Sequence, residues 1–209
     1  MTELELADGN LVPMLAAAGP QVMVAVAHAV DHRNPLAQGH SSRVAWIADA
    51  IGRRSNLLSN QMEDLSTAAF LHDVGHITLL ADGQNLEAPG HAEEGERIVA
   101  GAKFPVDVVN AVRHHHDRWD GAGQADGMTG ETIPMLARIL SVAERFEALT
   151  AGRSSARATP QAAFEQIVVG SGSEFDPAIV EGLGRAVHEG NFELNLPAVA
   201  LPAAAVATV

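Results

Sequence analysis

Residues 72 and 73 are a His-Asp pair, and further histidines lie at intervals on both sides of it. His40 lies upstream, while His91 and the run His114-His115-His116 lie downstream. Imidazole nitrogens bind borderline divalent ions such as zinc, iron, manganese and nickel, and an aspartate can bridge two such ions. A bridged pair of ions about 3.5–4 Å apart activates a water and holds a phosphoryl group. The pattern therefore predicts a metal site suited to phosphoester hydrolysis.

Apolar residues recur at helical spacing along most of the chain. Val44, Ile47 and Ile51 form one such stripe. A capping box is expected at Asn60 and Glu63, at the start of a helix that leads directly to the His-Asp pair. Helices are predicted over residues 21–33, 40–54, from 59 or 60 to 71, 91–102, 105–116 and 134–149, and from Thr159-Pro160 and Asp176-Pro177 to near 170 and 189. With no strand pair and no internal repeat, the chain is expected to be an all-α, single-domain helical bundle.

The domain is expected to occupy residues 21–190, after an irregular N-terminal lead (1–20) and before a low-complexity C-terminal tail (191–209). The 209 residues, 47% of them hydrophobic, suffice for a core. Aromatic residues are only 4% of the chain, which favours closely packed helices. With no regulatory domain ahead of residue 20, regulation is expected through expression, a homodimer or a separate signalling protein.

The net charge of −13 argues against a nucleic-acid polymer or an anionic membrane surface as partner, because both reward clustered Lys and Arg. It leaves room for a small phosphate ligand, since bound divalent cations would reverse the local charge. The chain has no cysteine, so the metal ligands are nitrogen and oxygen atoms. An acidic N-terminus and the lack of a long apolar span predict a soluble cytoplasmic protein.

An ordered set of short motifs resembles one known family over about residues 20–190. The set consists of Gly39-His40-Ser41, His72-Asp73-Val74-Gly75, His91-Ala92-Glu93-Glu94-Gly95, Arg113-His114-His115-His116-Asp117-Arg118-Trp119-Asp120-Gly121, Ile133-Pro134-Met135-Leu136-Ala137-Arg138-Ile139-Leu140, Phe146-Glu147-Ala148-Leu149-Thr150 and Phe175-Asp176-Pro177. The motifs are similar to those of the HD-domain phosphohydrolases, and the later ones resemble the HD-GYP subfamily of cyclic di-GMP phosphodiesterases.

The resemblance implies a pair of divalent metal ions, with iron or manganese expected and zinc, nickel or magnesium as alternatives. Asp73 would bridge the two ions. The other ligands would be His40, His72 and Glu144 at one ion and His91, His115 and His116 at the other. Hydroxide held between the ions would attack phosphorus in a cyclic dinucleotide, with cyclic di-GMP as the expected substrate. The candidates for substrate contact are Arg113, Asp120 and Arg153, although Asp120-Gly121 is also a turn signal.

The chain departs from the family pattern at four positions. Gly123-Gln124-Ala125 stands where the family has Gly-Tyr-Pro, and Glu144 stands where it has a metal-binding Asp, with Glu147 one turn on as a substitute or assistant. His76 replaces a Lys, so it could contact phosphate only when protonated, or donate a proton near neutral pH. Near residue 153 the family's Arg-Pro-Tyr-Arg becomes Arg153-Ser154-Ser155-Ala156, with Arg157 shifted.

These departures leave three functions open. The leading hypothesis is a metal-dependent phosphodiesterase that uses Asp73 and His76 in catalysis. The second is a degenerate, non-enzymatic signalling module that binds a ligand or a partner. The third is an HD-type phosphohydrolase with another nucleotide substrate.

Overall fold

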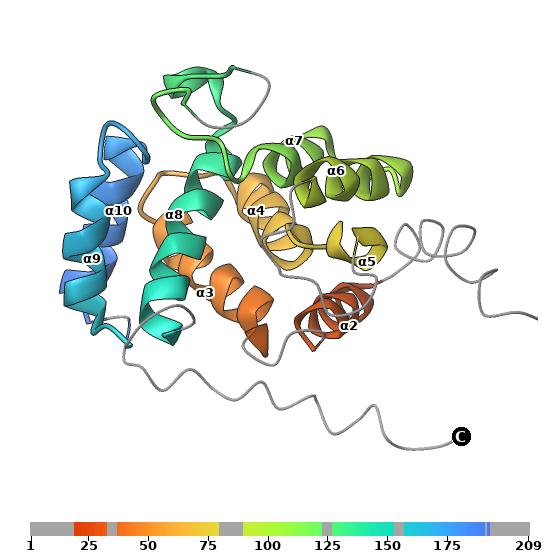
Figure 1. The fold of residues 1–209 in the computed structure, drawn as a ribbon, viewed down its shortest axis with the longest axis horizontal. Coiled ribbons are helices and arrows are strands. Elements are labelled where there is room, and N and C mark those ends of the chain that lie inside the picture. The colour runs from red at the N-terminus through yellow and green to blue at the C-terminus, as the bar shows by residue number, and fades with distance from the viewer. Residues whose placement is uncertain are drawn as a thin grey trace, which may run out of the picture.

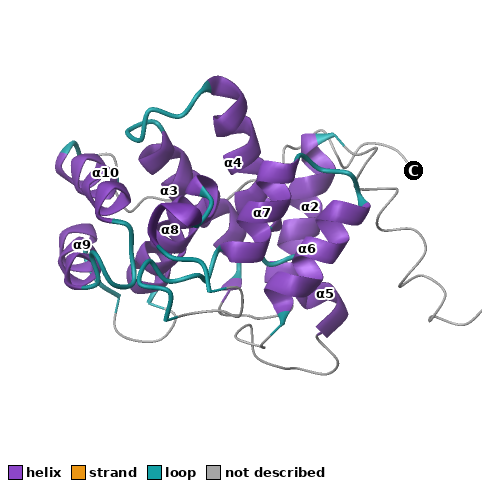
Figure 2. Cartoon of the chain, turned by 90° about the horizontal axis from the view of Figure 1, so that it is seen from above, coloured by secondary structure: helices purple, strands orange, loops and turns teal. Residues whose placement is uncertain are grey.

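The computed structural model describes residues 19–32, 37–79, 90–122, 127–152, 157–190 and 192, and among these residues it contains helices and no strand. The expected all-α class is therefore confirmed. The helices are α2 (Pro20–Asp31), α3 (His40–Gly52), α4 (Ser59–Leu71), α5 (His76–Leu79), α6 (His91–Gly101), α7 (Val106–His114), the 3-10 turn η3 (Gly130–Thr132), α8 (Met135–Ala151), α9 (Pro160–Val169) and α10 (Pro177–His188). In both ribbon views, α9 and α10 lie at one end of the bundle, and α2, α5 and α6 lie at the other (Figure 1, Figure 2).

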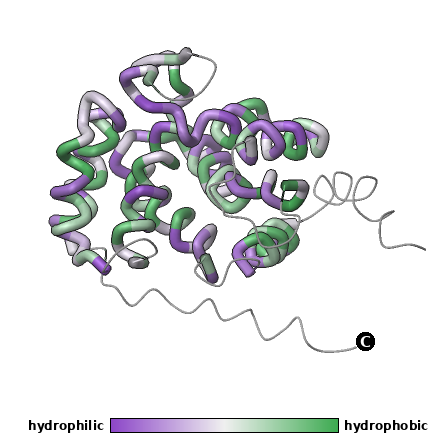
Figure 3. The backbone as a smooth tube through the Cα atoms, in the orientation of Figure 1, coloured by the Kyte–Doolittle hydropathy of each residue, from purple (hydrophilic) through white to green (hydrophobic). Residues whose placement is uncertain are grey.

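The middle of the bundle is formed by α3, α4, α7 and α8. Helix α3 packs against α4 and α8, and α7 packs against α4, α6 and α8. Their shared core includes the fully buried side chains of Ile47, Leu65, Ile139, Leu140 and Phe146. Hydrophobic and hydrophilic residues alternate along these helices, as expected where only one face is buried (Figure 3). Most of the candidate ligands lie at the ends of α3, α4 and α7, while Glu144 lies within α8 and His91 begins α6.

Most helix starts agree with the sequence prediction. The side chain of Thr159 caps α9 by accepting from the backbone N–H of Ala162, and that of Asp176 caps α10 by accepting from Ala178. The capping box of α4 is different from the one expected, because Gln61 rather than Glu63 accepts from the backbone, at Leu58. The other predicted helix ends agree to within about two residues.

Several expectations fall outside the described residues. The predicted N-terminal lead and C-terminal tail do so almost entirely, as do the altered Gly-Tyr-Pro position and Arg153. Among the described helices, none is both long and apolar enough to cross a membrane.

Two glycines allow α5 and α6 to approach closely. A Cβ atom on Gly75 would lie 2.0 Å from the backbone oxygen of His91 and 2.6 Å from the backbone nitrogen of Gly95. A Cβ on Gly95 would lie 2.8 Å from a methyl of Val112. Only glycine fits at the first position without a shift of the backbone, so Gly75 determines how near His91 lies to the His-Asp pair.

Candidate metal centre

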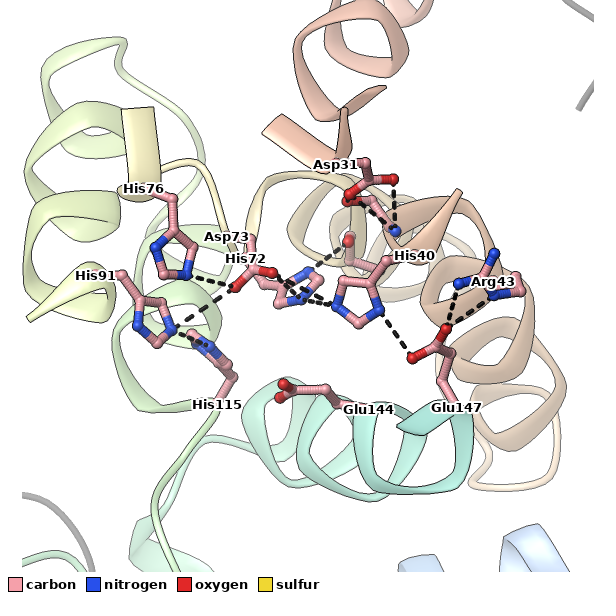
Figure 4. Close-up of polar contacts among 12 residues, drawn as sticks. Asp31, His40, Arg43, His72, Asp73, His76, His91, His115, Glu144 and Glu147 are labelled. Atoms are coloured by element: carbon pink, nitrogen blue, oxygen red, sulfur yellow. Dashed lines mark hydrogen bonds and ion pairs between the residues drawn. The ribbon is translucent and has the colours of Figure 1, made fainter. Parts of the chain in front are cut away.

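The predicted ligands come together from the ends of four helices and the middle of a fifth (Figure 4). Each terminal ligand is fixed by a helix boundary, so the fold places these side chains without a long loop. His40 is the first residue of α3, and His91 is the first residue of α6. The pair His72-Asp73 directly follows α4, and the pair His115-His116 directly follows α7. Glu144 lies within α8.

Three donors form the first group. One ligand atom each from His40, His72 and Glu144 lie within 4.8 Å of one another. The Nε2 atoms of His40 and His72 are 3.1 Å apart, and Oδ2 of Asp73 lies 3.5 and 3.4 Å from them. Neighbouring ligands of a divalent ion, with bonds of about 2.0–2.2 Å, lie about 3 Å apart. The group therefore has the spacing of a metal site.

A second group lies on the other side of Asp73. Ligand atoms of His91, His115 and His116 also lie within 4.8 Å of one another. Nε2 of His91 is 3.2 Å from that of His115 and 2.9 Å from that of His116. The second carboxylate oxygen, Oδ1 of Asp73, lies 3.7 Å from His91. The two oxygens of Asp73 therefore face different groups, which is the arrangement that a bridging carboxylate would need.

Backbone carbonyls determine which ring nitrogen faces the centre. Nδ1 of His72 lies 2.8 Å from the carbonyl oxygen of Ala69, and Nδ1 of His115 lies 2.8 Å from that of Val112. A carbonyl oxygen only accepts, so Nδ1 carries the proton and Nε2 keeps a lone pair. This arrangement, in which the outer nitrogen donates a hydrogen bond, is the usual one for metal-binding histidines.

Glu147 lies outside both groups. Its carboxylate is 1% exposed, with Oε2 2.9 Å from Nδ1 of His40 and Oε1 accepting from Nε of Arg43 at 2.8 Å. The sequence suggested Glu147 as a substitute for Glu144, but it contacts the outer nitrogen of a candidate ligand instead. Arg43 was not recognised in the sequence, although its position three residues after His40 places both on one face of α3.

The electrostatics of the site favour an ionised bridge. Burial alone would raise the pKa of Asp73, but attraction to His72 and a hydrogen bond to His40 hold it well below its usual range. Burial alone would lower the pKa of His40, but hydrogen bonds to Asp73 and Glu147 raise it to about 10. Burial lowers the pKa of His115 well below its usual value. In the metal-free protein His40 therefore carries a proton that a bound cation would have to displace.

The next feature is the burial and charge of the His76 ring. Its ring is fully buried and stacked on that of His91, with centroids 4.3 Å apart, and neither ring nitrogen has a hydrogen-bond partner among the described residues. Burial, together with the nearby histidines, lowers its pKa to about 4, and bound cations would lower it further. A ring with this pKa is uncharged near pH 7, which disfavours the predicted cationic contact to phosphate. Its Nε2 nevertheless lies 3.7 Å from Oδ1 of Asp73, next to the candidate centre.

Arg113 and Asp120, the two described candidates for substrate contact, lie outside these two groups. The guanidinium of Arg113 forms ion pairs with Glu93 and Glu96, at 2.7 and 3.2 Å. Asp120 accepts from the backbone N–H of Ala122 and from Arg118, as expected of a turn residue. Both side chains therefore have internal partners in this structure.

Fold and site together define an all-helical protein whose candidate metal ligands surround a His-Asp pair. A family model described as HD domain matches residues 25–179, which is most of the chain. The chain therefore belongs to the HD-domain family. Within this family, the chain is of the HD-GYP type that the sequence motifs resemble. Its relatives among the cyclic dinucleotide phosphodiesterases support this assignment.

Two curated relatives illustrate the similarity. The cyclic di-GMP phosphodiesterase response regulator RpfG of Xanthomonas campestris is 32% identical over 78% of this chain and 47% of the relative. The 3'3'-cGAMP-specific phosphodiesterase 2 of Vibrio cholerae is 27% identical over 82% of this chain and 35% of the relative. The chain thus spans about half or less of the length of the relatives it matches.

Solved structures show the same fold. A cyclic GMP-AMP specific phosphodiesterase from Vibrio cholerae superposes with a TM-score of 0.66 at 21% identity, covering 82% of this chain and 49% of that one. An HDG"Y"P protein from Bdellovibrio bacteriovorus gives a TM-score of 0.59 at 19% identity, covering 76% of this chain and 52% of that one.

Proposed function

We propose that this chain is a metal-dependent phosphodiesterase that hydrolyses a cyclic dinucleotide, with cyclic di-GMP as the first candidate. The observation that supports this most is the position of Asp73, whose two oxygens face two separate groups of histidine and glutamate donors. Relatives named for cyclic di-GMP and for 3'3'-cGAMP support the substrate class.

In this proposal Asp73 would bridge two divalent ions. His40, His72 and Glu144 would hold one, and His91, His115 and His116 would hold the other. Imidazole and carboxylate ligands suit iron or manganese. Such a pair of ions activates a water and stabilises charge on the phosphoryl group. The protein contributes a buried arrangement in which Nε2 atoms converge and the bridging carboxylate remains ionised.

In the proposed reaction His76 acts as an uncharged imidazole. Neither ring nitrogen has a hydrogen-bond partner among the described residues, and Nε2 lies 3.7 Å from Oδ1 of Asp73, so the imidazole could exchange hydrogen bonds with the attacking water or with a phosphoryl oxygen. Because an imidazole that is uncharged near pH 7 is a weak acid, water would supply the proton for the departing ribose oxygen in this proposal. We propose that Arg113, Asp120 and Arg153 contact the substrate, for which Arg113 and Asp120 would exchange their present internal partners.

The proposal includes action in the cytoplasm and regulation through a homodimer or a separate signalling protein. Light scattering coupled to size-exclusion chromatography, with and without cyclic di-GMP, measures the oligomeric state.

The experiment that tests the proposed function is hydrolysis of cyclic di-GMP and of 3'3'-cGAMP by protein loaded anaerobically with Fe²⁺ or Mn²⁺. We expect turnover by the wild type and its complete loss in Asp73→Ala. The matched control is His188→Ala, because His188 lies on α10, where its ring bonds to the carbonyl of Gly184 and contacts the ring of Phe164. Bound metal without turnover of either dinucleotide would contradict the proposal and favour the binding-only module. Turnover of a different nucleotide alone would favour the third hypothesis.

A further inference from the structure

The carboxylate of Glu147 sits behind one of the candidate ligands rather than among them. It lies on α8 one turn after Glu144, and in Figure 4 it approaches the outer edge of the His40 ring while Glu144 approaches the centre. Oε2 of Glu147 is 2.9 Å from Nδ1 of His40. Since Nδ1 donates to this carboxylate, Nε2 of His40 is the nitrogen left to face His72 and Asp73.

Arg43 holds the same carboxylate from the other side. Its Nε and Nη2 atoms lie 2.8 and 2.6 Å from Oε1 of Glu147, so both donors converge on the oxygen that His40 does not use. Nη1 of Arg43 donates to the carbonyl of Gln38, in the turn just before α3. Arg43 therefore fixes the carboxylate relative to the first turn of the helix that carries His40.

The burial of this pair makes its geometry rigid. The side chain of Glu147 is 1% exposed and that of Arg43 is 19% exposed. A buried carboxylate without partners is strongly destabilising, so both oxygens of Glu147 are held where donors exist. Those donors lie on α3, and the carboxylate lies on α8, so the pair also determines the separation of the two helices that carry His40 and Glu144.

We infer that Glu147, held by Arg43, is a positioning residue that orients the His40 imidazole and thereby determines the affinity of one of the two metal sites. The inference rests on the proposed metal centre and adds to it a residue outside the ligand set. For His72 and His115, a backbone carbonyl accepts from the outer ring nitrogen and so orients the ring. The carboxylate of Glu147 does the same for His40. Removing such an outer partner of a ligand typically weakens metal binding by about tenfold to hundredfold.

The test measures Mn²⁺ binding rather than hydrolysis, by electron paramagnetic resonance of the free ion during titration of the full chain. We expect Glu147→Ala to weaken one of two binding steps about tenfold to hundredfold and to leave the other unchanged. Glu147→Gln keeps an oxygen that accepts from Nδ1, so its affinity is expected between those of Glu147→Ala and the wild type. Glu144→Gln, which removes a proposed ligand, identifies the affected step.

Asp31→Asn is the matched control. Asp31 is also a buried carboxylate bonded to the first turn of α3, but it accepts from the backbone and hydroxyl of Ser41 rather than from the His40 ring. This variant is expected to bind both ions as the wild type does. Circular dichroism of the metal-free variants verifies folding, and the Gln variant keeps the test available where the Ala variant does not fold.

Three results would overturn the inference. They are wild-type affinity in both Glu147 variants, equal weakening of both steps, and the same loss in Asp31→Asn. The proposed function fails separately: a wild type that binds two ions without hydrolysing a cyclic dinucleotide contradicts the phosphodiesterase but leaves the affinity series valid. A wild type that binds no Mn²⁺ contradicts both.

Discussion

The imidazole of His76 differs from its neighbours in having no hydrogen-bond partner at either nitrogen among the described residues. The rings of His72 and His115 each contact a backbone carbonyl, and that of His114 contacts the carboxylate of Asp117 at 2.8 Å. An unsatisfied buried polar group costs free energy that an apolar side chain of similar size does not. His76 is therefore expected to stabilise the metal-free fold less than an apolar side chain of similar size would.

We predict that His76→Leu raises the free energy of unfolding of the metal-free protein by about 1 kcal/mol and lowers the rate of phosphodiester hydrolysis. Urea unfolding in the presence of a chelator measures the first effect, and an assay with Mn²⁺-loaded protein measures the second. His114→Leu is the control, and it should destabilise the protein because it leaves Asp117 buried without its partner. A less stable His76→Leu protein would show that His76 contributes to the fold instead.

Single residues of the site were predictable where they belong to ordered motifs. The spacing of His40, His72, Asp73 and His91 identified side chains that the structure brings together. The sequence did not reveal that His76 would be neutral, because burial and the approach of His91 depend on the packing of α5 on α6. It assigned the ligand role to Glu144 and kept Glu147, one turn on, as a substitute or assistant; only the packed structure shows that the carboxylate of Glu147 contacts Nδ1 of His40.

At the level of elements, helix starts with a Ser, Thr or Asp cap followed by proline were predictable, and the starts of α9 and α10 are examples. The start of α4 was less predictable, because the sequence suggested a capping box at Asn60 and Glu63, whereas the helix begins one residue earlier, after Leu58, and Gln61 accepts from the Leu58 backbone. The close contact of α5 with α6 could not be foreseen, since Gly75 and Gly95 lie 20 positions apart in the printed sequence.

This close contact leads to a prediction for Gly75→Ala. The added methyl would lie 2.0 Å from the carbonyl oxygen of His91, so α6 must shift and His91 must move away from Asp73. We expect a loss of stability of about 1–3 kcal/mol, typical of overpacking, and weaker Mn²⁺ binding. Calorimetric unfolding and metal titration measure the two effects.

Gly182→Ala on α10 is the comparison for that variant. The nearest heavy atom to a Cβ at this position is 3.5 Å away, an ordinary contact, and alanine favours a helix more than glycine does. This variant should be as stable as the wild type or more so. Equal destabilisation by both substitutions would show that the α5–α6 contact has no special importance.

At the scale of the whole molecule, the histidines give the metal-free protein a stability that depends on pH. The pKa of His40 is raised to about 10 in the folded state, so its stabilising contribution is complete below its unfolded value of about 6.5 and is lost as pH rises toward 10. The pKa of His76 is lowered to about 4, so the unfolded chain binds this proton more readily and stability is lost as pH falls from about 6.5 toward 4.

We therefore predict that the free energy of unfolding of the chelator-treated protein falls between pH 7 and pH 10, and that His40→Gln removes much of this fall. Denaturant unfolding at a series of pH values provides the measurement. With saturating Mn²⁺ the fall should be smaller, because a bound ion replaces the proton on His40. A wild-type stability that is flat across this range would contradict the pairing of His40 with Asp73 and Glu147.

The candidate ligands are spread between positions 40 and 144 of a chain that contains no cysteine. Ions coordinated by His40 and Glu144, and by His91 and His116, would act as covalent-like cross-links that close long loops of the unfolded chain. Such closure restricts the unfolded ensemble most when the joined residues are far apart in sequence. The metal-loaded form should consequently resist proteases, and chelation should open the bundle to cleavage as reduction opens a disulfide-linked protein.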